Sequence, residues 1–243
     1  FGVLGVDDLV LVAHQDHFGA PVTRLVERNL SWLRDAKLPR AAKLALIPVL
    51  AATWKWVYYA PNTMEVLEHS EARRQGEPPP ESNARTWLEC WLPYFGARFV
   101  AMPVAFLPLG PLASANVCIN SLLAELLTNL HAFVTIVPSH AGEDLYRFEG
   151  RAGGRPEFYL RQVQGSANYR TGGFVNDLLH GWLNYQIEHH LFPDLSLRRQ
   201  EEAAPRVREI CERHGVDYIQ ESVWTRVRKT VAIMTGEATM KRA

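Results

Sequence analysis

The sharpest chemical signal in the sequence is a pair of adjacent histidines, His189 and His190, which follow Gln186. Residues three and four positions apart on a helix share one face, so these three side chains can converge on one point. Neutral imidazoles offer nitrogen lone pairs without accumulating negative charge, which suits iron or zinc. An arbitrary pair of adjacent histidines is more often an ordinary surface feature of an amphipathic helix. The residues around the pair decide between these two interpretations.

The segment NDLLHGWLNYQIEHHLFPDLS resembles the third histidine box of the membrane fatty acid desaturases. Its form, Q-x-x-H-H in place of H-x-x-H-H, is similar to that of the front-end and related bacterial acyl-lipid desaturases. The resemblance continues upstream in IVPSHAGEDLYRF, where one histidine follows the last apolar segment, and downstream in APRVREICERHGVDY. It covers about residues 113 to 225, and residues 1 to 112 more weakly.

The resemblance implies a di-iron centre at the cytoplasmic membrane face that activates dioxygen to desaturate a fatty acyl chain. Carried over by position, it implies metal ligands at His140, His189 and His190. Iron is therefore the expected cofactor, and a fatty acyl lipid and dioxygen are the expected substrates. A fatty acyl or sphingolipid hydroxylase or desaturase on the same scaffold would share these histidines and is the alternative.

Three further residues are expected to contact the metal ligands rather than the metal itself: Gln186, His180 and Asp177. Gln186 stands where other desaturases have a ligand, so it is either a neighbour of the ligands or a weak ligand itself. His180 lies off the ligand face, and it is placed with Asp177 beside the site, with a surface position as the alternative. Glu188 points away from the ligand face and is expected to be structural or part of an ion pair.

The first two boxes of the family, H-x-x-x-H and H-x-x-H-H, do not occur in these 243 residues. The nearest imitation is the pair His14 and His17, which lacks the doubled histidine. By order along the chain, FGVLGVDD resembles the segment just after the second box of the family. We therefore expect the C-terminal portion of a desaturase, incomplete at its N-terminus, that supplies part of the site and is inactive alone. A non-catalytic membrane fragment is the rival from another functional class.

The motifs, net charge and cysteines of the sequence limit the kinds of partner and cofactor that the protein can bind. The sequence contains no glycine-rich nucleotide fingerprint and no haem-binding domain, so electrons are expected from an external donor of the ferredoxin or cytochrome b5 type. Lys+Arg 26 balances Asp+Glu 26, which leaves no overall positive field to hold nucleic acid. The three cysteines lie far apart without a CxxC pair, which argues against a disulfide framework or a zinc ribbon.

Two long apolar segments can anchor the box to a membrane. Residues 113–138 carry only Glu125 as a formal charge, and a membrane span needs about 20 such residues. Residues 87–107 contain Arg98 and prolines, which a span tolerates where neighbouring groups satisfy them. The connecting PLGPL predicts a tight helical hairpin, within which Arg98 and Glu125 are expected to pair.

A third apolar segment, residues 44–60, is rich in aromatic residues and contains Lys55, a composition typical of the headgroup level. Basic residues flank the hairpin on both sides, which places both flanks in the cytoplasm. Were the third segment also to cross, the basic stretch 24–43 would lie outside, so we expect it to be interfacial.

The sequence thus predicts an all-α, desaturase-like single domain over residues 1–243, with a two-span hairpin at 86–138 and a cytoplasmic helical cap at 139–243. Within the cap, residues 174–190 are predicted to form one helix that ends near Leu191, where Phe-Pro-Asp follows. A second helix is predicted to begin at Pro205, to bury Val207, Ile210 and Cys211, and to end at Gly215.

Overall fold

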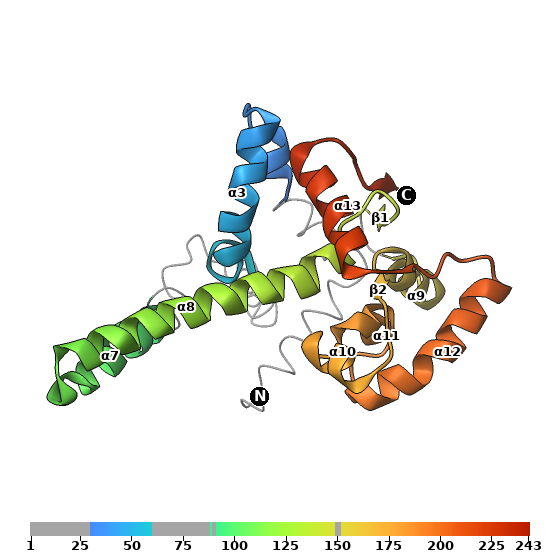
Figure 1. Ribbon diagram of the computed structural model, residues 1–243. Helices are drawn as coiled ribbons and strands as arrows, with labels where there is room; N and C mark the ends of the chain where they lie inside the picture. Colours follow the sequence, from blue (N-terminus) through green and yellow to red (C-terminus); the bar gives the residue numbers. More distant parts are fainter. Residues whose placement is uncertain (1–29, 60–87, 89–90, 149–151) are drawn as a thin grey trace, which may run out of the picture. The chain divides into compact units, whose positions relative to one another are not determined.

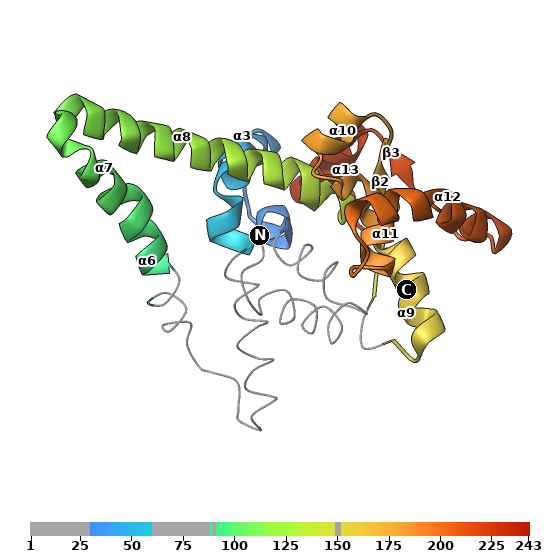
Figure 2. The ribbon, with the colours of Figure 1, turned by 90° about the horizontal axis from the view of Figure 1, so that it is seen from below.

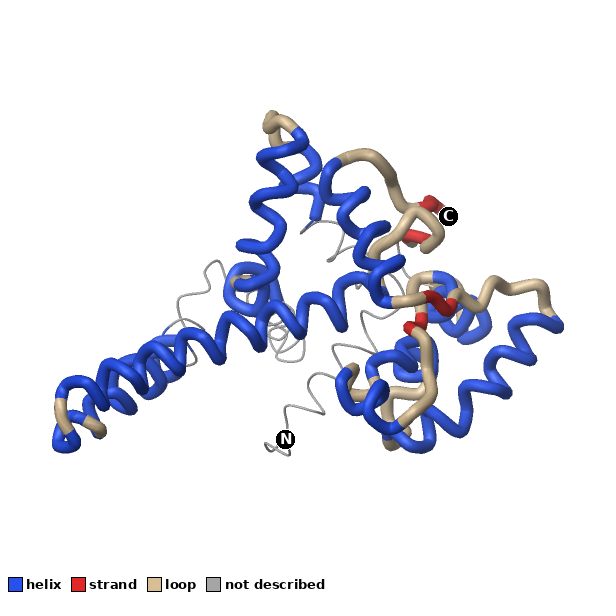
Figure 3. Tube along the Cα trace, in the orientation of Figure 1, coloured by secondary structure: helices blue, strands red, loops and turns tan. Residues whose placement is uncertain are grey.

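The computed structural model describes residues 30–59, 88, 91–148 and 152–243, and within these ranges the chain is mostly helical (Figures 1 and 3). The predicted helical class is confirmed, because the described strands are only two residues long each. The chain divides into two compact units, one of Phe1–Pro48 with Ala132–Ala243 and one of Val49–His131. The pair His14 and His17 lies outside the described residues.

Two apolar helical runs meet at Gly110 in the unit Val49–His131, and the second continues past His131. The first run comprises α6 (Leu92–Phe95), the π-helix η3 (Gly96–Ala101), α7 (Met102–Ala105) and the 3-10 helix η4 (Leu107–Leu109). The second is α8 (Pro111–Ile136), which η5 (Val137–Ser139) extends. Gly110 adopts a φ of 108°, which only glycine adopts without strain. Two stretches, Leu92–Leu109 and Pro111–Ser139, are long and apolar enough to cross a membrane, so the predicted hairpin of two spans is supported.

Proline explains why the first run is not a plain α-helix. Pro103 has no N–H to donate and its ring crowds the carbonyl four residues earlier. The chain widens to a π-helix just before it, and the backbone N–H of Met102 bonds to the carbonyl of Ala97. Over residues 91–105 the predicted span is therefore helical, with its hydrogen bonds shifted around the proline.

A buried carboxylate ties this unit together. The Glu125 side chain is 3% exposed, and it accepts a hydrogen bond from the Tyr94 hydroxyl. It pairs with Lys55 of the π-helix η1 (Lys55–Tyr59) and, at 3.4 Å, with Arg98. The predicted pairing of Arg98 with Glu125 is confirmed, and Lys55 joins it from a third segment. Preceding η1, α3 (Arg40–Ala52) is 13 residues long.

Residues 139–243 of the other unit form the cap. The cap contains the helices α9 (Arg155–Gln164), α10 (Phe174–Leu179), the 3-10 helix η6 (Leu183–Tyr185), α11 (Gln186–Leu191), α12 (Leu197–Arg213) and α13 (Val223–Thr235). Two short parallel pairs connect them: β1 (Tyr146–Arg147) with β4 (Lys241–Arg242), and β2 (Asn168–Tyr169) with β3 (Gln220–Glu221). In register, Tyr146 faces Lys241 and Asn168 faces Gln220.

The box helix α11 is held between two longer helices. It packs against both α9 and α12 (Figure 2). Val163 of α9, Ile187 of α11, and Val207 and Cys211 of α12 form one buried apolar cluster. Because α11 is only six residues long, this burial, rather than its own helix propensity, must stabilise it.

The single helix predicted over residues 174–190 is wrong. α10 ends at Leu179, and the next residues turn the chain, since Gly181 and Trp182 have φ values of 58° and 59°. These left-handed conformations cannot continue a right-handed helix. The buried Asp177 carboxylate stabilises the turn by accepting hydrogen bonds from the Gly172 N–H and, at 2.6 Å, from the Asn184 side chain. The predicted end at Leu191 is confirmed.

The predicted start of the next helix at Pro205 is also wrong. α12 begins at Leu197, with Ser196 as its N-cap, and Pro205 lies inside it. Pro205 is on the exposed face, where water can satisfy the carbonyl that its missing N–H leaves unpaired. Val207 and Cys211 are buried as predicted, but Ile210 is 42% exposed. Gly215, with a φ of 64°, follows the helix end as predicted.

Candidate metal centre

The three predicted histidine ligands lie together in the cap. His140 directly follows η5 at the end of the second apolar run, and its ring centroid is 4.8 Å from that of His190. The His189 ring lies 5.9 Å from the His190 ring, at an interplanar angle of 81°. His140 and His190 are almost completely buried, at 3% and 6% exposure. Two segments far apart in the sequence thus bring their imidazoles into contact.

The donor atoms of this group suit a metal ion, although the set is incomplete. Nδ1 of His140 and Oε1 of Gln186 are buried and have no hydrogen-bond partner, so two lone pairs are left unsatisfied there. Either atom could give a lone pair to a cation. Among the described residues, however, no three His, Cys, Asp or Glu side chains converge closely enough to hold one metal ion by themselves.

Burial keeps the imidazoles of His140 and His189 neutral. Burial, and then the nearby His189, lower the pKa of His140 to about 3. Burial also lowers the pKa of His189. A neutral imidazole is the form that can give a nitrogen lone pair to a metal, so this environment favours ligation over protonation.

Buried glutamines contact the two box histidines from opposite sides. Oε1 of Gln162, on α9, lies 3.3 Å from Nδ1 of His190. Because an amide oxygen can only accept, Nδ1 of His190 is the donor and the lone pair of the neutral ring is on Nε2. On the other side, Nε2 of Gln200 in α12 lies 3.4 Å from Nδ1 of His189 and also donates to the Leu195 carbonyl.

Glu188 turns away from the histidines, as predicted, and anchors the back of α11. It is fully buried, and its carboxylate accepts hydrogen bonds from Asn168 and Tyr218, each at 2.8 Å. Asn168 also accepts from the Ile187 N–H, so one side chain holds both the backbone and the carboxylate of the box helix. Burial raises the pKa of Glu188 above its usual value, against the hydrogen bonds from Asn168 and Tyr218.

Of the three residues predicted to support the ligands, only Gln186 lies on the helix of the two box histidines. Gln186 is 4% exposed and lies at the start of α11, on the same helix as the two box histidines. Asp177 instead stabilises the turn after α10. His180 contacts the Asn176 carbonyl through Nδ1 at 2.8 Å and lies against the Tyr169 ring, so it contacts the α10 and β2 segments.

Gln162, Asn168 and Tyr218 were not singled out by the sequence. Each belongs to a common residue type, and each lies far along the chain from the histidine that it supports or from Glu188. The only sequence signal for any of them was the HGVDY segment that contains Tyr218.

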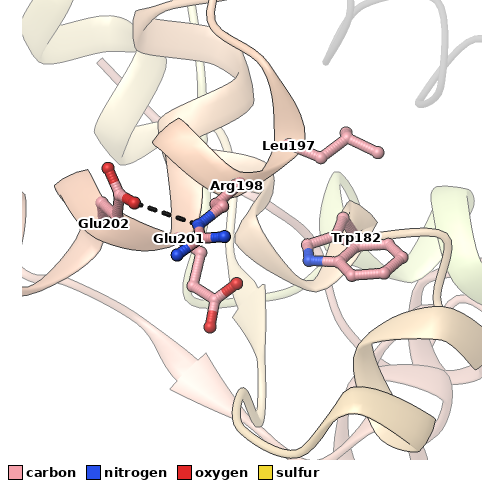
Figure 4. A pocket seen from close by; sticks show the side chains of 5 residues that line it. All are labelled: Trp182, Leu197, Arg198, Glu201 and Glu202. Atoms are coloured by element: carbon pink, nitrogen blue, oxygen red, sulfur yellow. Dashed lines mark hydrogen bonds and ion pairs between the residues drawn. The ribbon is translucent and has the colours of Figure 1, made fainter.

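A shallow surface pocket of about 620 Å³ lies beside the start of α12 (Figure 4). Its lining residues are Trp182, Leu197, Arg198, Glu201 and Glu202. Arg198 and Glu202 pair across one side of it at 3.3 Å. None of the box histidines lines this pocket, so it is separate from the histidine cluster.

Several known proteins are similar to this chain. One is the NADPH-dependent stearoyl-CoA 9-desaturase of Mycobacterium tuberculosis, 43% identical over 74 residues, which are 30% of this chain and 17% of that protein. Another is the acyl-lipid (7-3)-desaturase of Rebecca salina, 34% identical over 152 residues, 58% of this chain and 31% of that protein. The acyl-lipid (7-3)-desaturase of Diacronema lutheri is 36% identical over 124 residues, 51% of this chain and 27% of that protein.

The chain therefore matches less than a third of the length of each of these relatives. No solved structure matches it significantly. The family model for fatty acid desaturases, in contrast, matches residues 13–222, which include both apolar runs and the whole histidine cluster. With this match and the two candidate membrane helices, the chain belongs to the fatty acid desaturase family.

Proposed function

We propose that this chain supplies the C-terminal part of a di-iron centre that desaturates fatty acyl chains with dioxygen. The contact between the His140 and His190 rings carries the proposal, because it joins the end of an apolar helix to the histidine box. His140, His189 and His190 are the proposed ligands, and Gln186, whose buried side-chain oxygen has no hydrogen-bond partner, is proposed as a weak ligand or a neighbour of the ligands. Three imidazoles are too few for two irons, so the complete protein would contribute further ligands.

Bound iron would supply the activation of dioxygen and the attack on an unactivated methylene, which no side chain can perform. The residues of the chain have other tasks. Burial of His140 and His190 excludes water from both rings, and it lowers the pKa of His140 so that this imidazole stays neutral. Gln162 holds the proton of His190 on Nδ1 and so leaves Nε2 as the ligating atom.

The proposed partners follow from this chemistry. The substrate is a fatty acyl lipid, and the acyl-lipid desaturases among the relatives favour this class. Electrons would come from an external donor of the ferredoxin or cytochrome b5 type. The cap, with its histidine box, would face the cytoplasm, and the two apolar helices would anchor it in the membrane.

Lipid analysis tests the proposal. The complete protein that contains this chain is expressed in a host that lacks the corresponding fatty acid, and fatty acids are identified by gas chromatography with mass spectrometry. We expect a new unsaturated fatty acid, which His189→Ala and His190→Ala both abolish. His214→Ala is the matched control, because His214 is an exposed histidine after α12 and its loss should leave the product unchanged.

Other outcomes distinguish the alternatives. Hydroxylated fatty acids in place of unsaturated ones would identify a hydroxylase on the same scaffold. Unchanged fatty acids, in cells that demonstrably contain the protein, would support a non-catalytic membrane protein and count against the proposal.

A further inference from the structure

We infer that Arg226 is a positioning residue that fixes the turn carrying His140 and thereby sets where its imidazole lies. The inference rests on the proposed role of His140 as a metal ligand. It adds a residue from α13, outside the histidine box, to the machinery of the site.

The turn around His140 leaves carbonyl groups that its own helix does not satisfy. Nε of Arg226 donates to the Pro138 carbonyl at 3.0 Å, and Nη2 donates to the Ala141 carbonyl at 3.3 Å. These two carbonyls lie on either side of His140 in the sequence. One guanidinium therefore holds the backbone on both sides of the histidine.

Other contacts hold the same turn. The hydroxyl of Thr230, one helical turn after Arg226, donates to the Ala141 carbonyl at 3.2 Å. The Ser139 carbonyl accepts from the Ala167 N–H at 2.9 Å. The turn is thus fixed by α13 on one side and by the segment before β2 on another, and Arg226 is the side chain that bonds to it at two points.

Two carboxylates compensate the buried charge of Arg226. The guanidinium is fully buried, and its Nη1 contacts both Asp144 oxygens, at 2.8 and 2.7 Å, and Glu221 at 3.4 Å. Lys229 contacts the same two carboxylates, at 2.7 and 2.8 Å. Two cations therefore face two anions, which makes a buried arginine tolerable and fixes its orientation.

The fit of the turn around Arg226 is close. A Cβ added at Gly142 would lie 2.5 Å from Nη2 of Arg226 and 2.5 Å from Oδ1 of Asp144. Only a residue without a side chain lets the backbone approach the guanidinium this closely. The turn and the arginine are therefore matched in shape as well as in hydrogen bonding.

Arginine suits this position and lysine does not. A guanidinium offers donors in a planar fork, and here it reaches two carbonyls and a carboxylate in different directions. An ammonium is a single point with flexible placement. Removing a residue that contacts a metal ligand, rather than the metal itself, typically lowers metal affinity by about 10- to 100-fold. We expect an effect of this size for Arg226.

The test measures metal affinity rather than catalysis. The complete protein that contains this chain, in detergent and freed of metal, is titrated with Co²⁺, followed by the d–d absorption bands that report the ligands. We expect Arg226→Gln to weaken Co²⁺ binding by about 10-fold or more and Arg226→Lys to fail to restore it. Lys229→Gln is the matched control. It removes one positive charge from the same cluster, but among the described residues Lys229 contacts the carboxylates and not the turn, so affinity should be kept.

His140→Ala separates the two possible failures. If His140→Ala binds Co²⁺ with the affinity and spectrum of the parent, His140 is not a ligand and the proposed function of this residue fails. If His140→Ala weakens binding but a folded Arg226→Gln does not, the positioning role of Arg226 is overturned and the ligand role stands.

Gly142→Ala covers the case in which Arg226→Gln does not fold. This change keeps every charge but pushes the guanidinium from its place, so it should weaken Co²⁺ binding in the same direction. Circular dichroism confirms that the variant is helical. An unchanged affinity in a folded Gly142→Ala protein would contradict the inference.

Discussion

At the scale of single residues, an imidazole binds a metal only through the nitrogen that carries its lone pair. Gln162 decides this for His190, because its oxygen accepts from Nδ1. We predict that Gln162→Leu weakens Co²⁺ binding by about 10-fold, since the ring can then rotate and change tautomer. Gln162→Glu keeps an acceptor oxygen and should bind the metal nearly as the parent does. Absorption titration of the complete protein in detergent measures both.

Gln164 is the control for this prediction. It is a half-buried glutamine on the same helix, and Gln164→Leu changes the same chemical group at a neighbouring position. Equal effects of Gln162→Leu and Gln164→Leu would show that loss of helix stability, and not the tautomer of His190, causes the weakening.

The carboxyl group of Asp144 should make the stability of the cap depend on pH. Burial would raise the pKa of this carboxyl, but Arg226 and Lys229 outweigh burial and hold the pKa below its ordinary value of 3.8. A carboxyl with a lowered pKa in the folded state stabilises that state above its ordinary pKa, and the contribution disappears as pH falls through the lowered value. We therefore expect Asp144→Asn to destabilise the cap near neutral pH and to cost progressively less as the pH falls below 3.8.

Denaturant unfolding of both proteins at several pH values measures this difference. Glu221 faces the same two cations and also titrates, so the comparison must be between parent and variant at each pH and not between pH values alone. A destabilisation that is equal at neutral and acidic pH would show that Asp144 acts through packing.

The resemblance singled out the three histidines that the structure brings together, because the string QIEHHLFP and the segment around His140 are specific. It did not predict Arg226 or Gln162, since arginine and glutamine are common and their roles arise from contacts across the fold. The buried Arg226 is the clearest case, because nothing in its local sequence distinguishes it from the exposed arginines of α12.

At the scale of elements, the break between α10 and η6 determines where the box helix begins. Gly181 has a φ of 58°, and an added Cβ there would meet nothing within 4 Å. We predict that Gly181→Ala destabilises the cap by about 1 kcal/mol through backbone strain alone. Gly96→Ala is the control, because Gly96 also has open space around it but a helical φ of -60°. It should be neutral or slightly stabilising, and thermal unfolding of both variants tests the contrast.

Element boundaries were the weakest part of the sequence interpretation, and the reasons are local. Gly181 and Trp182 lie inside an apolar, helix-like pattern, and periodicity does not show that they adopt positive φ. Proline commonly begins a helix, but α12 begins after Ser196 and contains Pro205 in its interior. The helix tolerates this proline because the carbonyl that loses its hydrogen bond lies on the solvent side. The apolar spans were easier to predict, because their length and composition are constrained by the membrane itself.

At the scale of the whole molecule, the candidate membrane spans and the cap differ in which side chains they expose and which they bury. Most side chains of the two candidate spans are exposed in the isolated chain although they are apolar, as expected for surfaces that lipid covers. The cap instead buries charged and amide side chains in hydrogen bonds around the box helix α11. A membrane anchor and a polar cap are what the family assignment requires, but the sidedness of the cap depends on how many segments cross.

Cysteine labelling can count the segments that cross the membrane. With the three native cysteines replaced, single cysteines at Asp35, Leu109 and Arg198 would be exposed, since the parent side chains or residues are 65%, 75% and 85% exposed. Two spans place the first and last positions on the same side and the hairpin tip on the other. We therefore predict that a membrane-impermeant maleimide, applied to sealed vesicles, labels Asp35→Cys and Arg198→Cys from the cytoplasmic side and Leu109→Cys from the opposite side. If Asp35→Cys were labelled together with Leu109→Cys, the segment at residues 44–60 would cross the membrane and the interfacial placement would be wrong.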